Sequence, residues 1–198
     1  MLQLKEIADI FSGVAIRENK YGSARFMRLS DLSDLKAGRT PTLAMGDPPQ
    51  VARALTIENG DLIVAARGVI TDICIASGPV FGAYISLDLY LVRPNKKIAN
   101  SQYLAAYLSL PSTQAVFAGH KQGSSLARLA KDAFESTEIP VPPLPAQQRI
   151  ADLALSFEEE DKILRQLTSL NAAFSRVAVA RAIRAAEKNQ TSPRSPQP

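Results

Sequence analysis

The sequence contains few of the side chains that enzyme chemistry most often uses. It has one cysteine, Cys74, one histidine, His120, and no tryptophan. One cysteine excludes a disulfide within the chain, and one histidine beside it leaves no ligand spacing typical of zinc. A nucleophilic triad would depend on His120, which no serine motif supports. Since Cys74 stands between Ile73 and Ile75, we expect it to be a buried strand residue rather than a reactive thiol.

Long apolar runs and glycine-rich motifs are also missing. No apolar run reaches the length of a membrane span, and the mixed segment 1–6 does not resemble a signal peptide. No phosphate-binding loop or dinucleotide fingerprint appears. We therefore expect a cytoplasmic protein that is not an enzyme and carries no cofactor.

One short segment resembles a catalytic motif. Asp47-Pro48-Pro49-Gln50 resembles the Asp-Pro-Pro-Tyr motif of amino-methyltransferases, in which the aromatic ring stacks on a flipped base. Gln50 has no ring, and no cofactor-binding fingerprint precedes the segment. We interpret it as a surface loop.

The overall composition is that of an ordinary globular chain. Of the 198 residues, 46% are hydrophobic and 21% are charged, which suffices for one domain with an appendage. The net charge of +4, with a pI of about 9.3, permits binding to nucleic acid without requiring it.

Closely spaced apolar segments in the first half predict a sheet. The helix and loop signals there are short: a helix over residues 4–11, a loop over 16–23, a capped helical turn over 30–35 and a loop over 36–50. The expected strands are 24–29, 62–66, 69–76, 80–85 and 87–92, with 51–57 as a strand or an approach to one. Such spacing favours a mixed or antiparallel sheet, and hence an α+β fold.

The second half changes to a helical pattern. We expect helices over 101–110, 111–117 and 126–135, with a polar loop over 119–125. The proline cluster 139–145 predicts an extended strut over 140–143, and Pro145 suits the first turn of a helix. From there to Lys188 the chain contains no further proline and no glycine.

That last helix carries an apolar stripe with coiled-coil spacing, which we call the seam. Glu160 interrupts it, so a local stutter or a polar contact is expected there. Packing of the helix against its own domain is the alternative, although the seam is longer than a small domain can cover. The seam consists of Ile150, Leu153, Phe157, Ile163, Leu167, Leu170, Phe174 and Val177.

Three segments carry a resemblance to a known family. They are Leu4 to Gly13 (LKEIADIFSG), Asn59 to Val64 (NGDLIV) and Ile139 to Ala151 (IPVPPLPAQQRIA). On these segments, the chain resembles the specificity subunit of type I restriction-modification systems over nearly its whole length. The last segment is the most specific, although Ala146 stands where the family often has Glu.

The resemblance implies a domain organisation and a set of partners. It implies a target recognition domain over 1–139, a junction over 140–145, a long conserved helix over 146–188 and a disordered tail over 189–198. Family members usually hold two such units in tandem with antiparallel helices, and each domain reads half of a split DNA site. They are not catalytic; they position methyltransferase subunits, which use S-adenosylmethionine, and motor-nuclease subunits, which use ATP.

This sequence offers one such domain and one helix. We therefore expect a half-subunit whose seam pairs with a second copy. The resulting homodimer would read an inverted repeat in double-stranded DNA and position methyltransferase subunits, with a motor-nuclease subunit as a further candidate partner.

The residues that contact DNA must be chosen on chemistry, because recognition loops vary most within the family. Arg and Lys suit phosphates, while Arg, Asn and Gln suit base edges. Three candidate stretches offer such residues on expected loops or strand ends: 17–21, 67–68 and 119–125. Arg39 is a weaker candidate. The candidates are Arg17, Asn19, Lys20, Tyr21, Arg67, His120, Lys121, Gln122 and Ser124.

Two other functions are compatible with the same sequence. In one, the chain is a scaffold in which the long helix is the functional part. In the other, it is an antirestriction decoy that binds methyltransferase subunits without reading DNA. Both predict the absence of any sequence preference on DNA, even with partners present.

Overall fold

The computed structural model describes residues 1–51, 54–122 and 127–190. The chain divides into two compact units, Met1–Ala151 and the segment from Asp152 onward. The first is the globular domain together with the start of the long helix. The second is the remainder of that helix, and each is described by itself.

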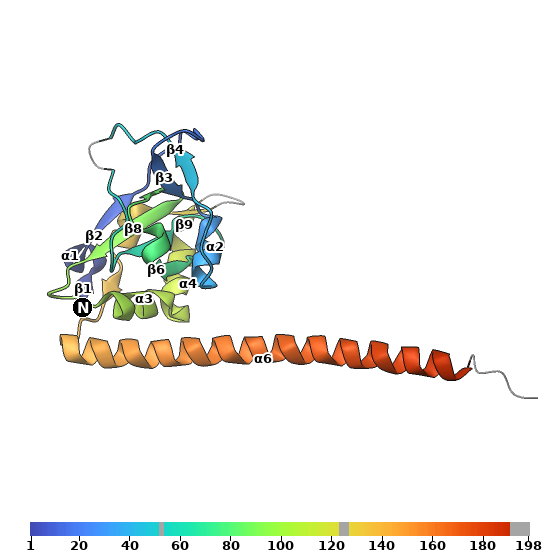
Figure 1. Ribbon diagram of the computed structural model, residues 1–198. Helices are drawn as coiled ribbons and strands as arrows, with labels where there is room; N and C mark the ends of the chain where they lie inside the picture. Colours follow the sequence, from blue (N-terminus) through green and yellow to red (C-terminus); the bar gives the residue numbers. More distant parts are fainter. Residues whose placement is uncertain (52–53, 123–126, 191–198) are drawn as a thin grey trace, which may run out of the picture. The chain divides into compact units, whose positions relative to one another are not determined.

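The domain is organised around a four-stranded antiparallel sheet in the order β2-β8-β5-β6 (Figure 1). Its strands are β2 (Ala8–Ser12), β8 (Leu89–Pro94), β5 (Leu62–Ala65) and β6 (Ile73–Ile75). Strands β5 and β8 are nearly continuous apolar runs because both faces of this sheet are covered. Alternate residues therefore belong to two separate cores.

A second sheet and two short ladders complete the strand structure. The second sheet has the order β4-β3-β7, with β3 (Ala24–Met27) antiparallel to β4 (Ala44–Gly46) and parallel to β7 (Tyr84–Ile85). The ladders pair β1 (Leu2–Gln3) with β11 (Glu138–Ile139) and β9 (Lys121–Gln122) with β10 (Arg128–Leu129).

Two of the helices begin where the local chemistry predicts. The Asn100 side chain caps α3 by accepting a hydrogen bond from the Tyr103 N–H at 3.0 Å, and Pro111 opens α4. The helices are α1 (Leu4–Ile7), α2 (Asp31–Lys36), the 3₁₀ turn η1 (Gly78–Val80), α3 (Ser101–Ser109), α4 (Pro111–His120), α5 (Lys131–Glu135) and α6 (Leu144–Gln190). None of the helices in these described ranges is both long and apolar enough to cross a membrane.

The expected fold class is confirmed, but several segment boundaries are wrong. The helix predicted over 4–11 stops at Ile7, because Ala8–Ser12 pairs with β8 and alternates buried and exposed residues. The strand predicted over 69–76 begins only at Ile73. The strand predicted over 80–85 forms only at its end, after a 3₁₀ turn.

Most of the remaining differences involve short strands, which form by pairing with a partner strand and leave little signal in the sequence. The loop predicted over 36–50 contains β4, and residues 54–57 form no strand. Helix α4 runs on through His120 into β9, so the start of the polar loop predicted over 119–125 is regular structure. The helix predicted over 126–135 is instead β10 followed by the short α5.

The Gly-Asp segment before β5 is held by an ion pair whose carboxylate is buried. The Asp61 carboxylate is almost fully buried and accepts hydrogen bonds from Arg93 Nε at 2.9 Å and Nη2 at 2.8 Å. It also accepts from the Glu58 N–H at 2.7 Å. The hydrogen bond to Asp61 raises the pKa of Arg93 above its ordinary value. A buried carboxylate requires such partners, which explains an acidic residue at the start of an apolar strand.

Gln147 anchors the first turns of α6 to the domain. Its side chain is fully buried and accepts a hydrogen bond from the Asn100 N–H at 2.8 Å. Its amide group donates to the carbonyl oxygens of Ile98 at 2.9 Å and Pro142 at 2.8 Å. Ala151, one turn later, is also fully buried in the domain core.

The close approach at Gly13 gives a test of the packing between the two sheets. A Cβ atom at this position would collide with the carbonyl oxygens of Ile85 and Ser86. We expect Gly13→Ala to lower the free energy of unfolding by an amount on the order of 3 kcal/mol, because backbone would have to move. Urea unfolding followed by tyrosine fluorescence measures this, since all five tyrosines lie within residues 21–107.

Gly119→Ala is the matched control. A Cβ at Gly119 would meet nothing within 4 Å in the part of the chain that the structure describes, and the residue lies in α4. The helical preference of alanine predicts no loss, or a gain of up to about 1 kcal/mol. Equal effects of the two substitutions would contradict the packing described at Gly13.

Candidate nucleic-acid interface

The loop over residues 16–23 is fixed along the edge of β4. The Asn19 N–H donates to the Met45 carbonyl at 3.0 Å, and the Asp47 N–H donates to the Arg17 carbonyl at 3.3 Å. The Asn19 side chain donates to Asp47 Oδ1 at 2.9 Å and accepts from the Tyr21 N–H at 3.0 Å. Asn19 therefore supports the loop, and much of its amide is committed within the domain.

The same loop presents a cation and an aromatic ring together. The Lys20 ammonium lies 4.8 Å from the centre of the Tyr21 ring, and Tyr21 is 84% exposed. Arg17 is exposed too, and its side chain has no ion-pair partner within the described ranges. An exposed ring beside exposed cations suits stacking on bases and contact with phosphates.

Arg67 is partly neutralised by a neighbour. Its Nε lies 2.8 Å from Asp88 Oδ1, and both side chains are about two-fifths exposed. Its backbone forms an antiparallel bridge with Arg128, whose Nη1 donates to the Leu87 carbonyl at 2.8 Å. Arg67 and Arg128 thus lie next to each other.

Lys121 is engaged within the fold rather than extended into solvent. Its ammonium donates to the carbonyl oxygens of Gly68 and Val69, both at 2.8 Å. Burial lowers the pKa of Lys121 below its ordinary value, while the nearby charge of Asp72 acts in the opposite direction. The structure therefore joins two of the candidate stretches, the one at Lys121 and the one at Arg67-Gly68.

The rest of the predicted 119–125 stretch is only partly described. His120 is the last residue of α4 and is exposed. Gln122 lies in β9, but its side chain is not among those described. Ser124 lies outside the described residues.

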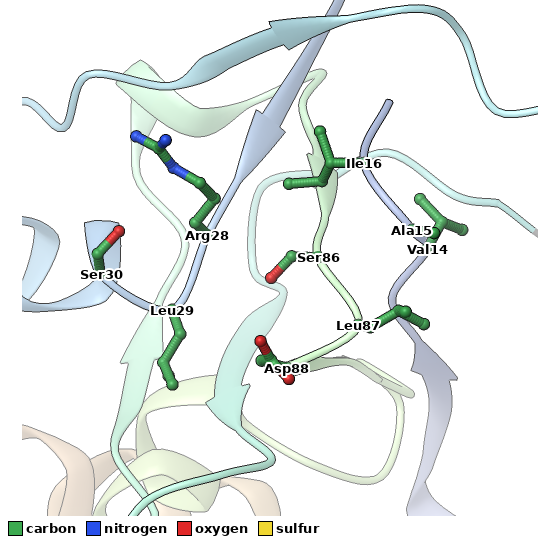
Figure 2. A pocket seen from close by; sticks show the side chains of 9 residues that line it. All are labelled: Val14, Ala15, Ile16, Arg28, Leu29, Ser30, Ser86, Leu87 and Asp88. Atoms are coloured by element: carbon green, nitrogen blue, oxygen red, sulfur yellow. The ribbon is translucent and has the colours of Figure 1, made fainter. Parts of the chain in front are cut away.

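A cavity of about 450 Å³ lies between the start of the 16–23 loop and the β7–β8 turn (Figure 2). Ile16 lines it on one side and Asp88, the partner of Arg67, on another, so it separates two candidate stretches. Its lining residues are Val14, Ala15, Ile16, Arg28, Leu29, Ser30, Ser86, Leu87 and Asp88.

Two polar atoms in the wall of this cavity are out of solvent's reach. Arg28 Nε and Ser86 Oγ are buried and have no hydrogen-bond partner among the described residues. They are equally out of reach of a ligand in this conformation. The cavity presents polar and apolar groups in similar measure, and the Arg28 guanidinium in its wall is already paired with Glu18 and Asp31. Its chemistry gives no reason to expect a small anionic ligand.

Sequence reasoning missed Arg28 and Arg128 as members of this surface. Arg28 lies 3.7 Å from Glu18 and 3.5 Å from Asp31, which joins the 16–23 loop to α2. The flanking of an apolar strand by arginines was a usable signal for Arg28. No signal marked Arg128, because the surrounding segment has helical spacing.

Comparison with known proteins identifies the family. The family model described as the type I restriction modification DNA specificity domain matches residues 1–170. The chain belongs to this family. The matched range contains the whole globular domain, the junction and the first half of α6. No curated protein matches the sequence significantly.

Solved structures of specificity subunits share the fold of this specificity domain. The HsdS subunit from Thermoanaerobacter tengcongensis has 23% identity and a TM-score of 0.57, covering 87% of this chain and 38% of that one. The type I restriction-modification S subunit from M. genitalium has 13% identity and a TM-score of 0.56, covering 87% and 42%.

A third similar chain comes from a structure titled as the basis of complex assembly and conformational transition of the type I R-M system. It has 21% identity and a TM-score of 0.61, covering 90% of this chain and 41% of that one. The specificity domain and its helix thus span about two-fifths of the length of these solved chains.

The exposed cation on the 16–23 loop gives a test of DNA contact by the specificity domain. We expect Lys20→Ala to weaken binding to every duplex and to reduce the slope of log affinity against log salt concentration by about 0.9, the value for one phosphate contact. Fluorescence anisotropy titrations at several salt concentrations measure both. Lys5→Ala, an exposed lysine outside all three candidate stretches, is the control; the same slope change in both variants would contradict a specific contact at Lys20.

Proposed function

We propose that this chain is the sequence-specific DNA recognition subunit of a type I restriction-modification complex. In this proposal the domain up to about residue 139 reads DNA, and α6 beyond the junction at 140–145 joins it to a second recognition unit. The subunit is not catalytic; it places methyltransferase subunits, and in some systems a motor-nuclease subunit, at the chosen site. Its working compartment is the one that holds the DNA, the cytoplasm.

The observation that carries the proposal is the extent of the family match. It covers the domain, the junction and the helix to residue 170, rather than a domain alone. The hydrogen bonds of the Gln147 side chain make the start of α6 part of the domain. Both observations support a protein in which a DNA-recognition domain and a spacer helix act together.

The seam supports pairing of α6 with another helix. All eight of its side chains are exposed, from 44% at Ile150 to 73% at Phe174. Such a stripe is costly to leave in water and is typical of a coiled-coil face. Further exposed apolar side chains lie outside the seam, at Leu155, Leu164, Val179 and Ile183.

The charges along α6 favour a second copy in the antiparallel direction. Residues 158–161 are all acidic, whereas Arg176, Arg181 and Arg184 are basic. Glu159 and Asp161 pair within the helix, with Lys162 and Arg165, but Glu158 and Glu160 have no ion-pair partner among the described residues. A parallel copy would place acidic residues beside acidic ones, and an antiparallel copy would place them toward the basic end.

Two recognition domains related by a two-fold axis would read an inverted repeat with a fixed spacer. The spacer length would reflect the separation set by the paired helices. A tandem second unit of different sequence would instead give an asymmetric split site. The DNA site itself therefore reports which pairing operates.

Selection from randomised duplexes at about physiological salt, with the cognate methyltransferase subunit present, tests this function. We expect enrichment of an inverted repeat split by a constant spacer. An ungapped or asymmetric site would keep DNA reading but exclude the homodimer. No enrichment, with the methyltransferase subunit still bound, would favour the scaffold or the antirestriction decoy, which use the helix alone.

The seam gives a separate test of self-association. We expect Leu170→Asp to convert the protein to a monomer in light scattering at micromolar concentration, because it places a charge on the paired face. Since Leu170 is exposed in the single chain, tyrosine fluorescence of the domain should not change. Ser169→Asp, which adds the same charge beside the seam, should stay dimeric. A wild-type monomer under these conditions would refute pairing with a second copy.

A further inference from the structure

Two adjacent aliphatic side chains stand in solvent in the middle of the β5–β6 connection. Val69 is 90% exposed and Ile70 is 64% exposed. We call this pair the apolar tip. β-Branched residues of this kind are normally buried, and the sequence alone had placed both in a strand. The fold instead turns them outward, immediately after the candidate Arg67.

The apolar tip is held from both sides by long polar side chains. On one side, the Lys121 ammonium binds the carbonyl oxygens of Gly68 and Val69. On the other, the Gln114 amide accepts from the Thr71 N–H and donates to the Thr71 carbonyl, both at 3.0 Å. Gly68 has φ of +111°, a conformation that side chains disfavour. Thr71 is buried. Four hydrogen bonds therefore fix a loop whose two aliphatic side chains belong to neither core cluster of the described residues.

The charges around the apolar tip favour an anionic partner. Arg67 pairs with Asp88, and Lys36 pairs with Asp72. Lys121 and Arg128 bond to backbone carbonyl oxygens instead. Among these named groups, four cations thus stand against two carboxylates, a surplus of two positive charges. The apolar tip is fixed in place and has basic residues around it. A nucleic-acid groove is therefore a better partner for it than a neutral apolar protein surface.

We propose that the apolar tip contacts base pairs directly when the domain binds DNA. The inference rests on the proposed function and names residues that determine its specificity. Aliphatic side chains contact the methyl group of thymine in the major groove, or enter between base steps from the minor groove. Both modes depend on the bases and neither requires a hydrogen bond. Gln114 and Lys121 keep the loop in position from α4 and β9.

The test compares a double variant, Val69→Ser with Ile70→Ser, to the wild type on two duplexes. One carries the sequence recovered by selection and the other is random. Because both side chains are exposed, tyrosine fluorescence unfolding should be unchanged. We expect affinity for the selected duplex to fall by roughly tenfold or more, while affinity for random duplex stays within about twofold. Unchanged affinity for the selected duplex overturns the proposal.

Val116→Ser is the matched control, an exposed valine two residues from Gln114 on a different side of α4. It should leave both affinities unchanged, and an equal loss there would overturn the assignment to the apolar tip. Loss of methyltransferase subunit binding in the double variant, with DNA affinity intact, would assign the tip to a protein partner and overturn the proposal too.

Two further duplexes separate the modes of contact. Replacing thymidine by deoxyuridine in the selected site removes the methyl groups. If the apolar tip contacts those methyl groups, this replacement should lower the DNA affinity of the wild type but not that of the double variant. A bend seen by energy transfer between labelled duplex ends, and lost in the double variant, indicates insertion between base steps. If the wild type selects no sequence at all, the proposed function fails and this inference fails with it.

Discussion

The hydrogen bonds of the Gln147 side chain are the constraint on which this architecture depends. They join the N-terminus of α3, the chain before it and the proline junction to the first turns of α6. A buried amide must satisfy both its oxygen and its nitrogen, so this geometry has few alternatives. Ladder β1–β11 holds the strut from the other side. A helix that is exposed over most of its length thus begins with turns that are hydrogen-bonded into the domain.

Rigidity also characterises the surface that carries the candidate contacts. The 16–23 loop is fixed to β4 through Asn19, and the β5–β6 loop is fixed through Lys121 and Gln114. Asn19 and Lys121, which the sequence predicted to contact DNA, therefore form hydrogen bonds that hold loops in place. The groups left exposed include Arg17, Lys20, Tyr21, His120 and the apolar tip. A recognition surface built this way loses little conformational entropy on binding, which favours discrimination between sequences.

The fold class and the elements with strong local signals could be predicted. The β5 and β8 strands, the capped helix α3 and the long α6 after its prolines each follow from apolar runs, a cap or an absence of breakers. Segments whose local pattern conflicts with their pairing were misassigned. Ala8–Ser12 has helical spacing but becomes a strand, because the edge of β8 offers it hydrogen bonds. Residues 69–72 have the apolar pattern of a strand. They form a loop instead, because Gln114 and Lys121, which are distant in sequence, bind its backbone.

By itself, the sequence determined the family resemblance, the presence of a long helix with an apolar seam and the scarcity of catalytic side chains, since all three depend on residue identity and local spacing. Only the tertiary structure decided which basic residues remain available and where the apolar tip lies. The reason is that an arginine or lysine is indistinguishable in sequence whether it meets solvent, a carboxylate or a backbone carbonyl. That difference is created by contacts such as Arg67 with Asp88 and Lys121 with Gly68, which join residues far apart along the chain.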